Sequence, residues 1–282
     1  EKAVSRHWGV SVVLLVMFAA AETSAQHRPL VTEDPETVGA GRILVEVGTD
    51  YGRDVRFPVS GLSGHLNRVP VGVSLGVGSI AELQVDGGLW SRLAISDRRS
   101  GPLADLVRAP GATTSGVGDL VVATKVRVVQ ESGARPGVGF RIATKLPRTS
   151  IESGLGQGTM DFQTTLLVAK TVQSVRVVGN VGLGVLGDPT LGTRRNDALV
   201  YGVSFARALS EATEVVGEIH GQAARGEVPV TSESRGTLRF GARHTVGMLR
   251  LDAALLLGLT AIDAGVGMTA GLTYVFNAFS VP

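Results

Sequence analysis

Residues 42–51 read Arg42-Ile-Leu-Val-Glu-Val-Gly-Thr-Asp-Tyr51, and polar and apolar side chains alternate along this stretch. The apolar parity carries Ile43, Val45, Val47 and Tyr51. The charged parity carries Arg42, Glu46 and Asp50. Successive side chains of a β-strand point to opposite faces. The pattern therefore predicts a strand with one apolar face and one charged face.

The same alternation recurs along the rest of the chain at regular spacing. Apolar residues hold one parity in residues 69–77, 83–89, 120–128, 138–146, 162–168, 175–185, 199–205, 215–219, 238–242, 249–259 and 268–276. Together with the first stretch they predict about twelve strands, most of them roughly 9 to 14 residues long. Strands in ordinary globular proteins are about 5 or 6 residues long, so the length favours a membrane-spanning sheet.

The predicted connections alternate between short and long. Short connections lie near Ser79, Gln173, Ser210 and Gly247. Long connections cover residues 52–68, 96–116, 148–158, 188–196 and 225–235. Short turns on one side and long loops on the other are typical of outer-membrane barrels. We therefore predict an all-β fold, a single antiparallel transmembrane β-barrel of about twelve strands.

A water-soluble β-sandwich is the main alternative fold. It would place the apolar parity inside, whereas a lipid-embedded barrel reverses the faces, and alternation alone does not separate the two. The run Tyr274-Val-Phe276-Asn-Ala-Phe279 resembles the C-terminal assembly signal of outer-membrane barrels, although residues 280–282 extend past it. That resemblance, the strand length and the alternating connections favour the barrel, and they imply the barrel assembly machinery as a partner.

Residues 1–25 have the features of a secretory signal peptide. Lys2 and Arg6 precede an apolar run at 10–21, and Thr23-Ser24-Ala25 forms a small-residue cleavage site. A run of about 12 apolar residues is short of the roughly 20 that a spanning helix needs. We expect a signal peptide (1–25), a periplasmic N-terminal segment (26–41) and a β-barrel (42–282) in the bacterial outer membrane.

The composition excludes several classes of function. The 282 residues include no cysteine, which excludes disulfide scaffolds and thiolate metal sites. The 27 basic and 25 acidic residues give a net charge of +2, so nucleic acid is not an indicated partner. We expect no cofactor and no metal. The partners we expect are outer-membrane lipid, a small-molecule solute, and lipopolysaccharide, whose phosphates suit loop arginines such as Arg98 and Arg194.

The charged parity of such a barrel faces the lumen, and about twelve strands enclose more room than side chains alone fill. The residues that we expect to line the lumen are Glu46, Glu82, Asp86, Asp119, Lys125, Arg127, Arg141, Lys145, Arg176, Glu218, His220, Arg239, Arg243 and Arg250. A mixed lining favours small polar or amphipathic solutes over one sign of ion. The alternative is that these charges pair with each other and close the lumen.

One stretch resembles a known family. Gly118-Asp119-Leu-Val-Val-Ala-Thr-Lys125 is similar to the Gly-Asp strand opening of outer-membrane channels named for the meta-cleavage pathway of phenol degradation. The resemblance extends over most of the chain after residue 25. It implies a transporter of aromatic or other hydrophobic compounds, and it implies no catalytic residues. From the residues alone, Asp119 fits a turn position at a strand start better than a solute ligand.

The rival interpretation is an enzyme. The glycines of 182–187 match a dinucleotide motif without the helix it requires, and residues 72–76 match a nucleophile elbow inside a continuous strand. His244 or His220 could serve a barrel-embedded, lipid-modifying hydrolase, although polar wall residues are the simpler interpretation of both. We favour a non-enzymatic channel for passive passage of small, hydrophobic or aromatic solutes over this hydrolase and over a structural or surface-binding barrel. The candidate gates are the N-terminal segment and the 96–116 loop.

Overall fold

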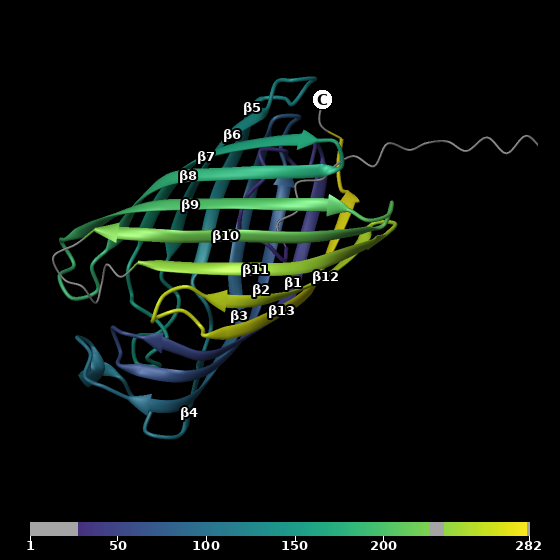
Figure 1. Cartoon of the computed structure of the whole chain (residues 1–282). Helices are drawn as coiled ribbons and strands as arrows, with labels where there is room; N and C mark the ends of the chain where they lie inside the picture. The colour runs from purple at the N-terminus through teal and green to yellow at the C-terminus, as the bar shows by residue number, and fades with distance from the viewer. Residues whose placement is uncertain (1–27, 226–233, 281–282) are drawn as a thin grey trace, which may run out of the picture.

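The computed structural model describes residues 28–225 and 234–280, and their strands form one antiparallel barrel (Figure 1). The strands are β1 (Arg42–Phe57), β2 (Leu62–Gly76), β3 (Ala81–Arg98), β4 (Thr113–Gly116), β5 (Leu120–Val129), β6 (Gly137–Leu146), β7 (Asp161–Val172), β8 (Val175–Gly187), β9 (Arg195–Ala208), β10 (Thr213–Arg225), β11 (Arg235–Val246), β12 (Leu249–Gly258) and β13 (Val266–Asn277). A short 3-10 helix, η1 (Ala104–Leu106), precedes β4. Within the described ranges, no helix has the length and apolar character needed to cross a membrane.

The barrel closes between its first and last strands. β1 pairs with β2 on one edge and with β13 on the other, from Arg42 opposite Asn277 to Arg53 opposite Val266. β3 pairs with β5 over residues 81–87 and with the short β4 over residues 91–94. β4 is thus an added edge on β3, and twelve long strands complete the ring. The predicted single antiparallel barrel of about twelve strands is confirmed.

Apolar side chains cover the outside of the barrel, as the lipid-embedded alternative requires. Leu183 and Leu255 are 64% and 62% exposed, whereas Lys125 and Glu82 are fully buried at 0%. This distribution reverses the pattern of a water-soluble protein, which buries most of its large apolar side chains and exposes most of its charged ones. The water-soluble sandwich is therefore excluded.

The structure corrects the predicted long loop at 52–68. β1 continues to Phe57 and β2 begins at Leu62, so that a turn of residues 58–61 joins them. A register shift between Gly52 and Val55 inserts an extra residue into β1 and changes which of its parities faces inward. Two further shifts in the β2–β3 pairing insert extra residues into β3. The inward parity of β2 also carries the apolar Leu62 and Leu66, so polar and apolar residues do not alternate regularly over 52–68 and the stretch resembled a loop.

After these shifts, apolar side chains point into the barrel. Val55, Leu62, Leu66 and Leu93 form a buried cluster near the 58–61 turn, with Leu155 of the 147–160 loop packed against it. The other described connections alternate as predicted, whereas most of the predicted 225–235 loop and the predicted signal peptide (1–25) lie outside the described residues. We call the end with the connections at 77–80, 130–136, 173–174, 209–212 and 247–248 the short-turn end, and the end with those at 58–61, 99–119, 147–160, 188–194 and 259–265 the loop end.

The inward cluster can be tested by truncating Leu93, which is 0% exposed. Leu93→Ala leaves a cavity, so we expect it to lower the free energy of unfolding by about 2–5 kcal/mol. Leu83→Ala on the same strand is the matched control, because Leu83 is 43% exposed on the outer face and detergent refills the space. Urea unfolding in micelles, followed by Trp90 fluorescence, measures both. Equal losses would contradict the inward position of Leu93.

Candidate functional site

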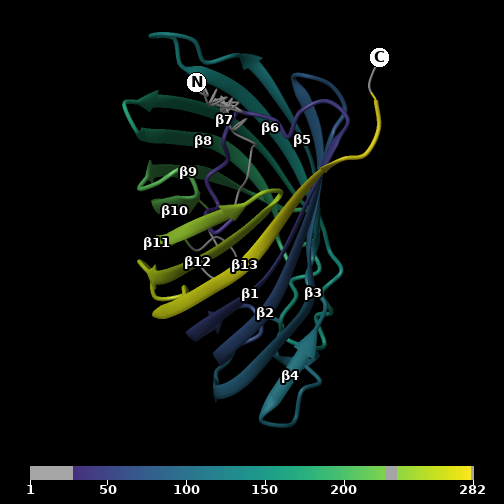
Figure 2. The ribbon, with the colours of Figure 1, turned by 90° about the vertical axis from the view of Figure 1, so that its right-hand side faces the viewer.

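The chain that precedes β1 lies inside the barrel. Residues 28–38, which we call the inner segment, run within the ring of strands at the short-turn end (Figure 2). The inner segment contacts Glu46 on β1, Glu82 on β3, Arg141 on β6, Arg176 on β8 and Glu218 on β10. Contacts with strands around the whole ring place it across the lumen. These contacts were not predicted from the sequence.

Polar side chains of the wall bind the backbone of the inner segment. The Glu218 carboxylate accepts hydrogen bonds from the Val31 amide (2.9 Å), the Thr32 amide (2.8 Å) and the Thr32 hydroxyl (2.7 Å). Glu82 accepts one from the Val38 amide at 2.7 Å. A buried backbone amide without a partner is costly. Wall carboxylates therefore replace the strand partner that this segment does not have.

The acidic side chains of the inner segment face basic strands. Glu33 lies 3.1 Å from the Arg141 guanidinium and 3.6 Å from the Lys125 ammonium. The inner segment continues with Asp34, which accepts a hydrogen bond from Arg176, and with Glu36, which pairs with Arg127. These ion pairs lie inside the barrel and are shielded from bulk water. Coulomb attraction is stronger in such an interior than at a protein surface.

The basic end of the inner segment faces acidic strands. The Arg28 guanidinium lies 3.5 Å from Asp252 and 3.8 Å from Asp50. It also donates a hydrogen bond to the Thr269 hydroxyl at 2.6 Å. The two ends of the inner segment therefore match opposite signs of charge on opposite parts of the wall.

The residues expected to line the lumen divide into two sets. Those that contact the inner segment are Glu46, Glu82, Lys125, Arg127, Arg141, Arg176, Glu218, Arg239 and Arg250. Those that pair elsewhere are Asp86 with Arg141, Lys145 with Asp161 and Asp119, His220 with Glu218, and Arg243 with Glu214. Charges that we expected to meet solute instead bind the protein itself. Their role as a solute-facing lining stays a prediction.

Asp119 has the structural position that the residues alone favoured. It precedes β5, and its carboxylate accepts hydrogen bonds from the amides of Arg148 and Thr149 at 3.0 and 2.9 Å. These bonds connect the start of β5 to the start of the 147–160 loop. Asp119 therefore orders the loop end through its Oδ1 atom, and its Oδ2 atom lies 3.9 Å from the Lys145 ammonium.

The residues that sequence reasoning missed are those of the inner segment, namely Arg28, Glu33, Asp34 and Glu36. A signal was present in the sequence, because Glu33-Asp34-Pro-Glu36 is a local concentration of acids. The middle strands carry Lys125, Arg127, Arg141 and Arg176 on the inward parity. Charge complementarity between the two sets could have predicted the docking.

Two carboxylates outside the membrane-spanning strands share Arg176. Burial acts to raise the pKa of Asp34, but the hydrogen bond and charge of Arg176 outweigh it and hold the pKa below its ordinary value. Burial also acts to raise the pKa of Glu131 in the 130–136 turn, yet hydrogen bonds from Lys170, the Thr171 amide and Arg176 lower it to about 2. Both groups are therefore ionised at neutral pH and hold Arg176 between them.

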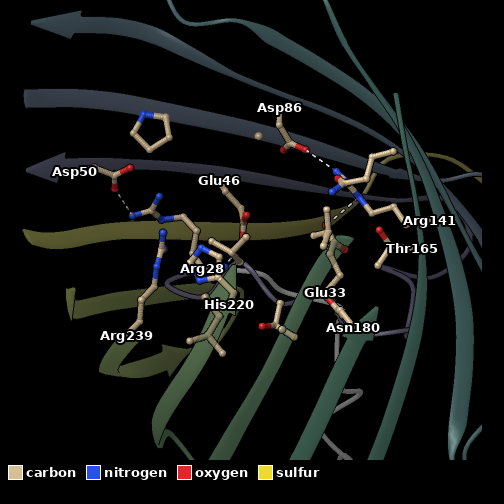
Figure 3. Close-up of a pocket in the computed structure, with 18 of the residues that line it drawn as sticks. Arg28, Glu33, Glu46, Asp50, Asp86, Arg141, Thr165, Asn180, His220 and Arg239 are labelled. Carbon is tan, nitrogen blue, oxygen red and sulfur yellow. Dashed lines mark hydrogen bonds and ion pairs between the residues drawn. The ribbon is translucent and has the colours of Figure 1, made fainter. Parts of the chain in front are cut away.

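A cavity of about 390 Å³ lies next to the inner segment, between it and the barrel wall. Figure 3 shows Arg28 and Glu33 beside this cavity, together with Asp86, Arg141 and His220 of the wall. Further cavities of about 370, 310 and 160 Å³ lie toward the loop end. Asp50 lines the 390, 310 and 160 Å³ cavities, so they adjoin one another. Open volume therefore extends from the loop end to the inner segment.

The two histidines considered for catalysis have structural partners. His220 Nδ1 lies 3.3 Å from the Glu218 carboxylate, and His244 Nδ1 lies 2.9 Å from the Thr213 hydroxyl. Over the described ranges, no group of three or more histidines and carboxylates is arranged to hold a metal ion. His244 and Thr213 lie at the short-turn end on the exposed side of the barrel.

Comparison with known proteins bears on the fold alone. No family model and no curated protein matches the chain. The barrel is similar to the crystal structure of an outer-membrane channel from Pseudomonas putida F1, with a TM-score of 0.62 and 14% identity over 86% of this chain and 98% of that one. It is also similar to the NanC porin, with a TM-score of 0.51 and 6% identity over 84% of this chain and 100% of the porin. The protein thus has an outer-membrane-type barrel fold.

The contacts of Glu218 with the inner segment can be tested by Glu218→Gln, which halves the acceptor capacity and removes the charge. We expect the Val31 and Thr32 amides to exchange their hydrogens at least about tenfold faster, because they lose a charge-assisted acceptor worth about 1.5–3 kcal/mol. Hydrogen exchange with mass spectrometry measures this. Glu214→Gln is the control, since Glu214 lies on the same strand and pairs with Arg243. Unchanged exchange in Glu218→Gln would contradict the docking.

The pKa of Asp34 predicts how docking depends on pH. Because docking lowers this pKa below 3.8, the contribution of Asp34 is complete above that value and is lost as the pH falls below it. A spin label on Val31→Cys, introduced into a chain without cysteine, should show the same mobility at pH 7 and pH 5. It should become mobile only below about pH 4. Asp34→Asn should be more mobile at every pH, and a transition near pH 6 would contradict the assignment.

Proposed function

We propose that the protein is a non-enzymatic channel of the bacterial outer membrane for passive passage of small solutes. The observation that carries the proposal is the open volume inside a closed barrel, from the loop end to the inner segment. Small-molecule sites commonly have volumes of about 300–1,000 Å³. The fold shared with an outer-membrane channel and a porin supports this proposal.

The inner segment is the gate in this proposal. It is held by hydrogen bonds and ion pairs from side chains, whereas the barrel strands are held by their own backbone ladder. The segment can therefore leave the lumen without breaking a strand pair. Its departure would expose the basic side chains of the wall that now bind Glu33, Asp34 and Glu36. The charge of the open pore would thus differ from that of the closed one.

The orientation and the solute class extend the same proposal. An export signal at residues 1–25, followed by a segment that enters the lumen at the short-turn end, would place that end in the periplasm. The 118–125 resemblance to channels of the phenol meta-cleavage pathway suggests hydrophobic or aromatic solutes. Assembly machinery acting on the C-terminal strand, and lipopolysaccharide around the loop arginines, would be the partners. The apolar outer surface supports insertion in lipid.

Deleting residues 28–38 tests gate and channel together. In planar bilayers we expect the intact chain to show small or rare conductance steps, and the deletion variant to show steps several-fold larger. Removing the inner segment clears the lumen at the short-turn end. Heat-modifiable migration on gels should confirm that both proteins are folded.

A charge exchange provides the matched control. Glu36→Arg opposes Arg127 and should raise the open probability, whereas Glu36→Arg combined with Arg127→Glu restores an attractive pair and should lower it again. Silence of the folded deletion variant would contradict the channel. Equal conductance of the intact and deleted chains would contradict the gate.

A further inference from the structure

Two arginines at the loop end face internal cavities without a hydrogen bond or a close ion pair, although Arg68 lies opposite Asp50 in the β1–β2 pairing. Arg68 on β2 lines the 370, 310 and 160 Å³ cavities, and Arg235 at the start of β11 lines the 370 and 160 Å³ cavities. Neither side chain forms a hydrogen bond or an ion pair with another residue in the described ranges. Both arginines are exposed to solvent, and part of their exposed surface forms the walls of these cavities.

Other cations of the same cavities are neutralised. Lys145 lies 2.6 Å from Asp161, and Arg239 lies 3.4 Å from Glu218. The contrast shows that unpaired cations are not the rule inside this barrel. Arg68 and Arg235 are exceptions that lie in one region.

The nearby carboxylates already have other partners. Asp50, opposite Arg68, accepts the Thr269 hydroxyl at 2.7 Å and lies 3.8 Å from Arg28. Asp119 accepts the amides of Arg148 and Thr149, and Asp161 accepts the Gly187 amide at 2.9 Å and pairs with Lys145. Asp263 accepts the Gly236 amide at 2.8 Å and the Thr260 hydroxyl at 2.6 Å. Two like charges in one cavity repel each other. An anion entering the cavity would relieve that repulsion and gain two guanidinium partners.

Apolar side chains line the same space. Phe57 and Leu155 line both the 370 and the 310 Å³ cavities. Leu66 and Pro70 line the 310 Å³ cavity. A ligand that fits this lining has a charged end and an apolar body. An inorganic anion would leave the apolar wall unused, and a neutral hydrocarbon would leave the arginines unpaired.

We propose that the loop-end cavity binds a small organic carboxylate, with its carboxylate at Arg68 and Arg235 and its apolar body against Phe57 and Leu155. Planar guanidinium groups match the geometry of a carboxylate. The proposal rests on the proposed channel function and names its solute class. The inner segment closes the other end of the lumen, so the carboxylate reaches this site from the loop end with the gate closed.

Binding to the folded full chain after residue 25, in detergent, tests the site directly. Isothermal titration should detect benzoate binding at least about tenfold tighter than binding of phosphate, which has no apolar body, or benzyl alcohol, which has no charge. Arg68→Gln and Arg235→Gln should each weaken benzoate binding by about tenfold or more, since each removes a charge-assisted partner. Arg68→Lys should retain part of the affinity.

Arg92→Gln is the matched control. Arg92 lies on β3 next to Ser91, the residue opposite Arg68, and Ser91 lines a cavity, so Arg92 points to the other face of the wall. This variant should bind benzoate like the unchanged chain. Equal affinity for benzoate and phosphate, equal affinity for benzoate and benzyl alcohol, or benzoate binding unchanged in both glutamine variants would each overturn the proposal.

Conductance of the same proteins separates this site from the channel function. Ion flux through the deletion variant without benzoate binding to any variant would overturn the carboxylate site and leave the channel intact. Benzoate binding that depends on Arg68, in a protein that never conducts, would support the site and overturn the channel. Block of single-channel current by benzoate, lost in Arg68→Gln, would support both.

Discussion

The structure depends on one constraint, which is that a backbone inside lipid must satisfy its own hydrogen bonds. A closed antiparallel barrel achieves this because no strand edge is left open. β1 pairing with β13 completes the ring, and most side chains on its outer face can then be apolar. The same constraint moves the charged parity inward. The interior must then find partners for many charges in a space that bulk water only partly fills.

The two halves of the interior meet that requirement differently. At the short-turn end the chain supplies its own partner, because residues 28–38 carry acids toward the basic strands and Arg28 toward the acidic ones. These partners come from distant parts of the chain, such as Asp34 and Arg176, which are 142 residues apart. At the loop end, loop amides and apolar residues take this role. The docking of the inner segment is thus a consequence of barrel charge, and the proposed gate rests on it because side chains alone hold the segment.

Strand positions were predictable from the sequence because a period of two residues is a local property. Outside the bulges the alternation holds, and Lys125 and Arg141 have the inward positions that their parity indicated. The 52–68 stretch was not predictable in this way, since a bulge between Gly52 and Val55 reverses the parity of β1, and the inward parity of β2 then carries the apolar Leu62 and Leu66. The partners of the inward charges could not be predicted either. The alternation pattern assigns each side chain to a face of the sheet, but it does not show which residues far apart in sequence form pairs.

In the proposed channel, the division of the interior makes the loop end the place to expect selectivity. A charge that is neutralised by the docked inner segment contributes little field to a solute, and this applies to Lys125, Arg127 and Arg176. Arg68 and Arg235 line the loop-end cavities while the inner segment is docked. A solute arriving from the loop end therefore meets these two cations and the apolar wall beside them before it meets the inner segment. Selection precedes opening in such an arrangement, because the site that recognises the solute does not need the gate to move.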